Sequence, residues 1–402
     1  MSEFALAPSS RLAGFSPTRG FAWLVRHPPA FTLLLIVLVG LVVGTVNPGF
    51  WQIASMFDMA RAAVVRRLFG LGFFVVLAAG GLDMSFTAIA ALTMYLITTT
   101  VAHYAPDTPI AVILLLGAAG GAILGVANGA LVHSLKAPAL IVTIGTQCVI
   151  RGFLLTFIGT ELFVNIPISM VSFGEYELWR TRTEVGSIAI PPAYALVLVV
   201  ASAVTWWILN RTILGRAVFA VGGSPAIAQR LGYNIRTVEV FVFTYAGLLA
   251  GMAGIIFVSS NRVANPFDLM GSEMDIIAAV VLGGARITGG SGTVVGTLLG
   301  VILVTLVNNV LILAGIPSTW QKFVVGCFIV PPARSSACVR SAEAGTVHLA
   351  QTGETVLRAR ASAEVARALP EDVAVECLLE HVALFRNGPR LADAPWLESE
   401  LS

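Results

Sequence analysis

Charged residues are scarce in this sequence. They make up 11% of the 402 residues, whereas soluble globular domains carry about 25%. Lysine is nearly absent, since Lys136 and Lys322 are the only two in the chain. A surface with so few charges cannot all face water. The scarcity of charge therefore excludes an ordinary soluble domain.

Motifs of nucleotide-binding proteins and of enzymes are missing as well. Neither lysine lies in a G-x-x-x-x-G-K-[ST] loop, which would cradle the phosphates of ATP. No H-E-x-x-H motif occurs, and the five histidines are scattered. The cysteines lack the spacing of metal ligands; they are Cys148, Cys327, Cys338 and Cys377. We therefore expect no catalytic residue, cofactor or metal, no enzyme activity and no nucleic-acid partner.

Long apolar segments are abundant instead. Hydrophobic residues make up 57% of the chain, and the mean hydropathy is +0.88. The apolar segments are residues 31–46, 68–79 leading into 86–101, 110–132, 139–158, 193–209, 238–258 and 294–313, with shorter ones at 274–283 and 322–330. About 20 apolar residues span the hydrocarbon core of a bilayer. The sequence predicts an all-α, polytopic membrane protein with about ten transmembrane helices.

The placement of charge predicts the orientation of these helices. The region before the first segment is polar and contains proline, so we expect an anchor rather than a cleaved signal peptide. Basic residues precede the first segment and follow the fourth, sixth and eighth: Arg11, Arg19, Arg26, Lys136, Arg211, Arg216, Arg230, Arg236 and Arg286. Since basic loops stay in the cytoplasm, both termini are predicted to be cytoplasmic. Arg61, Arg66 and Arg67 leave two alternatives, a second span that starts after them or one that lines a wet cavity.

The chain changes character after Val330. Ten of its 22 acidic residues fall in the last 72 residues (402 − 330), where no apolar run could cross a bilayer. We expect three regions: a cytoplasmic N-terminal segment (1–30), a transmembrane domain (31–330) and an atypical polar tail (331–402). The tail has three alternative interpretations: a small cytoplasmic domain, a disordered segment, or a departure from the ancestral reading frame.

Two glycine-rich breaks interrupt the apolar pattern. In LAAGGLDMSFTAIAAL, residues 77–92, Asp83 stands between Gly80–Gly81 and Ser85. Either Asp83 caps the helix that starts near Ser85, or it contacts a solute on a transport path; its position favours the cap. GGARITGGSGT, residues 283–293, is a similar break five spans later. That odd offset would invert one copy relative to the other, as in inverted-repeat transporters.

Other glycines lie inside apolar helices. LGAAGGAILG and GLLAGMAG, residues 116–125 and 247–254, have no polar setting that suits a nucleotide loop. Small residues allow transmembrane helices to approach closely. These two stretches therefore predict tight helix–helix packing.

Several motifs together resemble the permease subunits of bacterial ABC importers for ribose and other simple sugars. They occur in the family's order, and each alone is weak. The motifs are GGLDMS (80–85), GVANGALVHSLKAPALIVTIGT (125–146), LGRAVFAVGGSPAIAQRLGYNI (214–235), YAGLLAGMAGIIFVSS (245–260), GSEMDIIAAVVLGGARITGGSGTVVGTLLG (271–300) and NNVLILAGI (308–316). The resemblance covers residues 31–330, and the tail has no counterpart in it.

This resemblance implies a subunit of the bacterial inner membrane that imports a sugar or sugar-like solute. It implies three partners besides the lipid bilayer: a separate ABC ATPase, a periplasmic solute-binding protein and a second permease subunit. The basic loop after the sixth span would couple to the ATPase through Arg216, Pro225, Ala226, Ala228, Arg230 and Gly232. The family's acidic residues at the start of this loop are replaced here by Ser224, Pro225 and Ala226, so a specific salt bridge is in doubt but the shape is not.

Polar residues within the apolar helices are candidates for the translocation path: Asn128, Thr143, Thr146, Asn308 and Asn309. The same side chains often join helices, which is the alternative. Two other functions stay open. A secondary transporter driven by an ion gradient would use ionisable groups such as Asp83, Arg151, Glu239 and Asp275, and a non-transporting scaffold would use the tail. The sequence specifies neither the solute nor whether the two permease subunits are identical.

Overall fold

The computed structural model describes residues 28–46, 48–175, 180–183, 186–189, 194–313, 344–348 and 358–362. The chain divides into two units, Met1–Val325 and Gly326–Ser402. The predicted N-terminal segment before residue 28, the predicted last span at 322–330 and most of the tail lie outside the described residues. Asn308 and Asn309 lie inside them.

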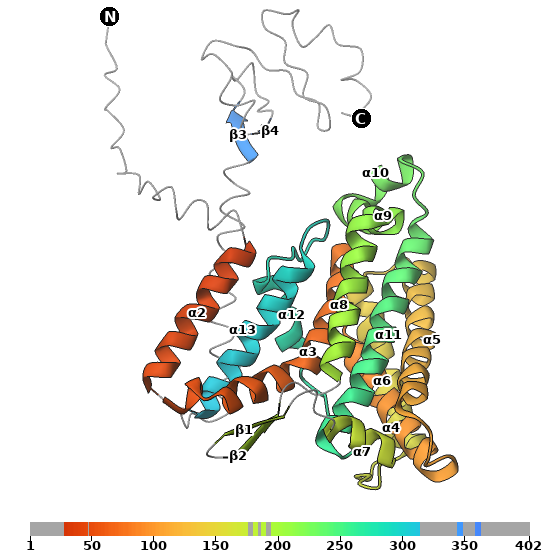
Figure 1. The fold of residues 1–402 in the computed structure, drawn as a ribbon. Helices are drawn as coiled ribbons and strands as arrows, with labels where there is room; N and C mark the ends of the chain where they lie inside the picture. The colour runs from red at the N-terminus through yellow and green to blue at the C-terminus, as the bar shows by residue number, and fades with distance from the viewer. Residues whose placement is uncertain are drawn as a thin grey trace, which may run out of the picture. The chain divides into compact units, whose positions relative to one another are not determined.

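The first unit is a helical bundle (Figure 1). Its first half consists of α2 (Pro28–Val46), the short η1 (Pro48–Trp51), α3 (Ile53–Ala78), α4 (Phe86–Tyr104), α5 (Ile110–Leu135) and α6 (Ala139–Phe153), which continues into the π-helical turn η2 (Leu154–Ile158). Its second half consists of α7 (Ile168–Glu175), α8 (Tyr194–Arg211), α9 (Ile213–Gly223), α10 (Pro225–Arg230), α11 (Ile235–Asn261), α12 (Glu273–Leu282) and α13 (Val294–Leu313).

Strands are short and peripheral in the described part of the chain. In the first unit, β1 (Arg180–Thr183) pairs antiparallel with β2 (Gly186–Ala189). In the second unit, β3 (Ala344–His348) pairs antiparallel with β4 (Arg358–Ser362), with Ala344 opposite Ser362. The described apolar segments of the first unit form helices, as the sequence predicts.

Four helices are long and apolar enough to cross a membrane within the described residues: Phe86–Tyr104, Ile110–Leu135, Ala139–Ile158 and Ile235–Asn261. The α8–α9 pair, bent by 74°, makes a fifth if it counts as one span. Two shorter apolar stretches lie within α2 and α13, at Pro29–Thr45 and Val294–Asn309. The total of about ten crossings therefore stays a prediction.

Helix α3 begins earlier than the apolar pattern suggested. Its first residue is Ile53, so Arg61, Arg66 and Arg67 lie within it rather than before it. Burial begins before the hydrophobic run, at Ala63 and Val64, and continues through it to Leu68, Phe73 and Phe74, which are fully buried. A boundary drawn from hydropathy alone misses helical turns that carry charge.

The core of the bundle is the packing of α11 against α5, α3 and α4. Glycines recur every fourth residue on α5, at Gly117, Gly121 and Gly125, and face glycines on α11. A Cβ atom added to Gly121 would lie 2.0 Å from the carbonyl oxygen of Gly247, and one added to Gly251 would lie 1.9 Å from that of Gly117. The prediction of close packing at these glycine clusters is confirmed.

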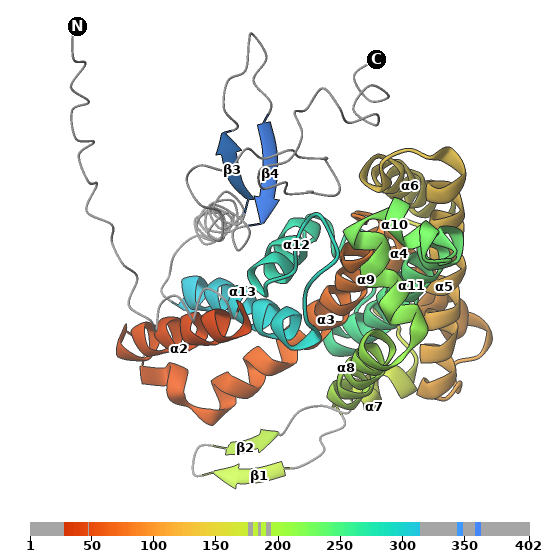
Figure 2. The same ribbon diagram turned by 90° about the horizontal axis from the view of Figure 1, so that it is seen from above.

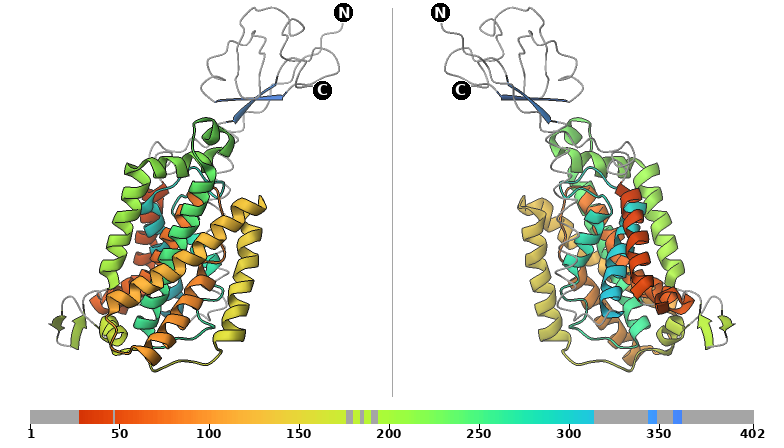
Figure 3. Two further views of the ribbon diagram at one scale, coloured as in Figure 1. Left: turned by 90° about the vertical axis from the view of Figure 1, so that its right-hand side faces the viewer. Right: turned by 90° about the vertical axis from the view of Figure 1, so that its left-hand side faces the viewer.

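The remaining helices are arranged around this core (Figure 2). In the view from the end that carries α10, helices α2 and α13 lie on one side of α3. Helices α5 and α6 lie on the other side. The two other views show α9 and α10 together at one end of the bundle and α7 at the opposite end (Figure 3). The bundle therefore has two distinct ends.

Candidate functional site

The first glycine-rich break, residues 79–85, joins α3 to α4. Gly80 has a φ of 84°, a left-handed conformation that glycine adopts without strain. Asp83 is 1% exposed, and its Oδ1 accepts hydrogen bonds from the backbone N–H and the hydroxyl of Ser85, at 2.7 and 2.6 Å. Ser85 is the N-cap residue of α4. The carboxylate thus closes a local turn at the entrance to the helix.

Neighbouring helices brace this turn through side chains. The Asn128 amide of α5 donates to the Ser85 hydroxyl at 2.6 Å. The Thr143 hydroxyl of α6 accepts a bond from the Met84 N–H at 3.1 Å and donates to the Leu82 carbonyl at 3.2 Å. Irregular backbone inside a membrane requires such partners, because lipid supplies none.

The five path candidates therefore do not form one group. Asn128 and Thr143 hold the first break, and the Thr146 hydroxyl donates to the Thr143 carbonyl at 3.1 Å within α6. Asn308 is buried in α13, next to Asn309, on a different part of the bundle. Any path role for these residues stays a prediction.

We expect Asp83→Asn to fold normally and Asp83→Leu to fold poorly. Asparagine keeps an Oδ1 acceptor for both bonds from Ser85, whereas leucine leaves a buried N–H and hydroxyl without their acceptor, at a cost of about 1–3 kcal/mol each. The measurement is the yield of monodisperse protein in detergent and its melting midpoint. If asparagine lowers both as much as leucine does, the charge rather than the two hydrogen bonds holds the break.

The second break, residues 283–293, joins α12 to α13. Gly284, Gly289, Gly290 and Gly292 all have positive φ values. The Arg286 N–H donates to the Ser291 carbonyl at 3.3 Å, which closes the loop. The Gly290 N–H donates to the Ala78 carbonyl at the end of α3, at 3.0 Å. The two breaks are therefore linked directly through their backbones.

The end of α9 packs into the same place. A Cβ atom added to Gly222 would lie 2.0 Å from the Ala78 carbonyl oxygen and 2.6 Å from the Gly290 nitrogen. One added to Gly289 would lie 2.6 Å from the Gly80 Cα atom and 3.0 Å from the Gly222 carbonyl oxygen. We call this contact of Gly80, Gly222, Gly289 and Gly290 the glycine junction. It joins both breaks to α9.

Helix α10 follows α9 after a single residue. Ser224 is its N-cap, accepting a bond from the Ile227 N–H at 3.4 Å, and Pro225 occupies the first turn, where a missing N–H costs nothing. Gly232, with a φ of 84°, ends the element, and the Tyr233 N–H donates to the Ala228 carbonyl at 3.1 Å. A short helix therefore starts at Pro225.

The predicted coupling residues lie on this α9–α10 element with different exposures. Ala228 is fully buried and fixes α10 to the bundle. The other five predicted coupling residues are exposed: Arg216, Pro225, Ala226, Arg230 and Gly232. Ile227 and Leu231, four residues apart, are 54% and 68% exposed, and the sequence analysis did not single them out. The element thus presents an apolar pair flanked by arginines.

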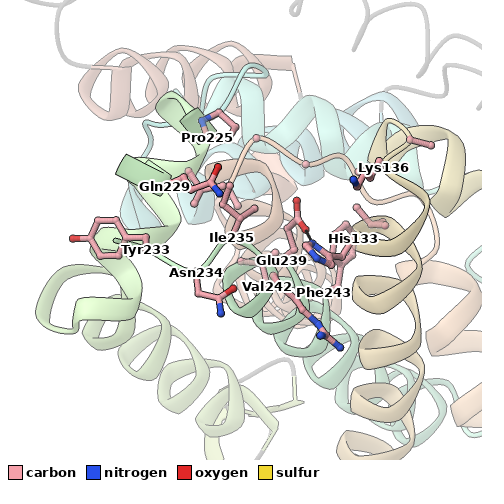
Figure 4. A pocket seen from close by; sticks show the side chains of 18 residues that line it. His133, Lys136, Pro225, Gln229, Tyr233, Asn234, Ile235, Glu239, Val242 and Phe243 are labelled. Atoms are coloured by element: carbon pink, nitrogen blue, oxygen red, sulfur yellow. Dashed lines mark hydrogen bonds and ion pairs between the residues drawn. The ribbon is translucent and has the colours of Figure 1, made fainter. Parts of the chain in front are cut away.

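A cavity of about 760 Å³ separates α10 from the end of α5 (Figure 4). Gly80 and Gly81 of the first break line it, as do Pro225 and Gln229 of α10. In Figure 4, Lys136 lies across the cavity from Gln229, and His133 and Glu239 point toward one another. The cavity therefore borders both the first break and α10.

His133 and Arg151 each form an ion pair with a glutamate. His133 Nδ1 lies 2.8 Å from Glu239 Oε2 beside this cavity. Arg151 of α6 pairs with Glu273, the first residue of α12. Sequence reasoning noted Arg151 and Glu239 separately but missed Glu273, because its partner is 122 residues away along the chain. No group of three or more metal-ligating side chains occurs in the described part of the chain.

The chain is similar in sequence to known transport permeases. The family model described as "Branched-chain amino acid transport system / permease component" matches residues 55–331. The ribose import permease protein RbsC of Escherichia coli (strain K12) is 31% identical over 312 residues, which cover 77% of this chain and 92% of that protein.

Other relatives are similar over a comparable length. RbsC of Bacillus subtilis (strain 168) is 34% identical over 75% of this chain and 89% of its own. The autoinducer 2 import system permease protein LsrC of Klebsiella pneumoniae is 32% identical over 75% of this chain and 82% of its own. No solved structure matches the chain.

Proposed function

The chain belongs to the permease-component family of ABC importers, and from this premise we propose that it moves a sugar or sugar-like solute handed over by a periplasmic binding protein. It is a membrane protein of the bacterial inner membrane and is not itself catalytic. Separate ATPase subunits supply the energy in this proposal. A second permease subunit, identical or related, completes the translocation path.

The observation that carries the proposal is the glycine junction. An importer must transmit motion from an ATPase outside the membrane to the spans inside it. The α9–α10 element is the exposed part of the bundle that touches both breaks, through Gly222. A displacement of α10 would therefore reach both interrupted spans at once, without an intermediate side chain.

The charge distribution supports a cytoplasmic position for α10. The end of the bundle that carries α9 and α10 has a set of basic residues: Lys136, Arg211, Arg216, Arg230 and Arg236. Among the described residues, the opposite end has fewer basic residues, Arg180, Arg182 and Arg262, together with the acidic Asp107, Glu161 and Asp268. Basic residues favour the cytoplasmic side, so the α10 end faces the ATPase in this arrangement.

The exposed part of α10 suits an ATPase cleft. Ile227 and Leu231 offer an apolar contact, and Arg230 beside them offers a charge to an acidic partner. Ser224, Pro225 and Ala226 stand where the family has acidic residues. The main contact in this proposal is therefore made by Ile227, Arg230 and Leu231. The adjacent cavity would then change shape when α10 moves, which makes it a candidate for the cytoplasmic exit of the path.

Replacing Ile227 by glutamate tests the docking surface. The side chain is 54% exposed, so the change should not affect folding, but it places a charge where an apolar contact forms on docking. We expect co-purification of the ATPase with the permease to fall about tenfold or more, since one lost apolar anchor costs about 2 kcal/mol.

Ile168→Glu is the matched control. Ile168 is 68% exposed at the start of α7, at the opposite end of the bundle. The control should retain the ATPase at the level of the unaltered protein. Equal retention in both variants would contradict ATPase docking at α10.

A further inference from the structure

A second polar cluster lies in the interior of the bundle, away from the glycine junction. Its centre is Glu273, the first residue of α12, which is 6% exposed. The Oε1 atom of Glu273 accepts bonds from the Thr87 hydroxyl of α4, from the Gln147 amide of α6 at 2.8 Å and from the Arg151 guanidinium of α6. Arg151 Nη2 also donates to the Thr87 hydroxyl at 3.2 Å. Three helices thus converge on one carboxylate oxygen.

Arg151 lies inside the apolar span Ala139–Ile158, seven residues before its end (158 − 151), which is about 10 Å along a helix. Arg151 is twelve residues beyond Ala139, the start of α6 (151 − 139), which is about 18 Å along a helix. The hydrocarbon core is about 30 Å thick. A charged pair at such depth is costly and is rarely kept for stability alone. In broken-helix transporters, polar solute sites lie near mid-membrane at the N-terminal ends of half-helices, and α12 is a ten-residue helix that begins at Glu273.

Glu273, Gln147 and Arg151 each have a polar atom without a hydrogen-bond partner in the described part of the chain. All three bonds of Glu273 go to Oε1, which leaves Oε2 without a partner among the described residues. Gln147 uses its amide N–H but not its carbonyl oxygen. The Nε atom of Arg151 is buried without a hydrogen-bond partner in the described part of the chain. Two acceptor oxygens are therefore available in one place, and an unpartnered N–H lies buried beside them.

The cluster lies at the edge of an open face of α6. Only 22% of the residues in this span are buried, compared with 67% in α4. A Cβ atom added to Gly145 or Gly152 would meet nothing within 4 Å, and Cys148 between them is exposed. The Arg151 side chain keeps 22% exposure. A guanidinium facing lipid tails is unfavourable, so this edge requires water or polar groups.

We propose that Gln147, Arg151 and Glu273 form a solute-contact site inside the membrane, which binds the hydroxyl groups of a neutral polyhydroxylated solute. Each hydroxyl can donate a hydrogen bond, which matches the free oxygens of Gln147 and Glu273. The site deepens the proposed function and rests on it. A neutral solute leaves the ion pair intact, so it can bind and leave without separating charges.

Gln147→Leu is the first test, because it removes the amide and keeps the Arg151–Glu273 pair. In proteoliposomes with the ATPase and the binding protein, we expect uptake of radiolabelled ribose to fall about three- to tenfold per ATP hydrolysed. The melting midpoint should match that of Gln52→Leu, a control at an exposed residue whose side chain makes no capping bond. Glu273→Gln should lower uptake per ATP further, by about tenfold or more.

Cys148 provides a second test in the same importer. With Cys327, Cys338 and Cys377 replaced by serine, a charged methanethiosulfonate should modify Cys148 during turnover, and ribose delivered by the binding protein should slow the reaction. Modification by N-ethylmaleimide but not by the charged reagent would place this face in lipid and overturn the proposal.

The outcomes separate this proposal from the one it rests on. If the unaltered importer takes up ribose and Gln147→Leu and Glu273→Gln lower only the melting midpoint, the cluster is a structural clamp and the contact site is wrong. If uptake per ATP is unchanged in both variants, the contact site is also wrong, and the importer function stands. If the unaltered protein with its partners moves no member of a panel of pentoses, hexoses, polyols and autoinducer 2, both proposals fail.

Discussion

Replacing Gly222 by alanine should uncouple ATP hydrolysis from transport while leaving the protein folded. The added methyl carbon would lie 2.0 Å from the Ala78 carbonyl oxygen, about 1.4 Å closer than ordinary contact permits. The end of α9 must therefore move away from both breaks. The hydrogen bond between Gly290 and Ala78, now 3.0 Å long, borders the same contact and should weaken with it.

The expected magnitude follows from typical coupling energies. Coupling between distant sites amounts to about 1–3 kcal/mol, so loss of the contact should reduce transport per ATP roughly tenfold. The readout is the ratio of solute taken up to ATP hydrolysed in proteoliposomes. Binding of the ATPase to the permease should persist, because the exposed residues of α10 are unchanged.

Gly223→Ala is a matched control one residue away. Nothing lies within 4 Å of a Cβ atom added there, so this variant should transport like the unaltered protein. Equal ratios of transport to hydrolysis in the two variants would mean that the glycine junction does not carry the motion.

Replacing Gly121 by alanine should destabilise the whole bundle. Helices α5 and α11 pack backbone against backbone here, and the new methyl carbon would lie 2.0 Å from the Gly247 carbonyl oxygen and 3.0 Å from the Gly251 nitrogen. Neither neighbour is a side chain that can rotate away. Overpacking of this kind costs about 1–3 kcal/mol or more, which lowers the melting midpoint by roughly 5–10 °C.

Gly145→Ala controls for the intrinsic effect of alanine in an apolar helix. Gly145 faces open space on α6, so its replacement should leave the melting midpoint unchanged or raise it slightly, since alanine favours helix. The account of the core is wrong if Gly121→Ala melts at the same temperature as this control.

Local patterns in the sequence predicted the features that depend on local chemistry. The glycine spacing in residues 116–125 and 247–254 predicted close helix packing, because only small residues permit it. Pro225 is at the first turn of α10, where proline is favoured. The two breaks followed from clusters of glycine, which favour turns that other residues resist.

Long-range pairings could not be predicted in this way. Glu273 and Arg151 are far apart in the sequence, and each by itself is an ordinary charge near a helix end. Asn128 and Thr143 were proposed for a path because they are polar and lie in apolar helices, yet both bond to the first break. Which polar group meets which depends on how the helices are arranged, and hydropathy carries no such information.

Hydropathy left one boundary open. The apolar run begins at Leu68, and the three arginines before it allowed either a later start of the span or a span that lines a wet cavity; the helix starts at Ile53 and includes all three. Backbone hydrogen bonding continues through charged turns, provided that their side chains find water or a partner. The meeting of the two breaks at Gly222 likewise required the structure, although each glycine cluster was visible in the sequence.

Uptake into proteoliposomes tests the central claim most directly, namely that an external ATPase acts on the two breaks through α10. The measurement is the accumulation of radiolabelled ribose or autoinducer 2 with the permease alone, with its ATPase, and with both the ATPase and the binding protein. We predict uptake only with all partners and ATP, and a roughly tenfold lower uptake per ATP in Gly222→Ala. Accumulation by the chain alone, driven by a proton or sodium gradient, would contradict the account and identify a secondary transporter.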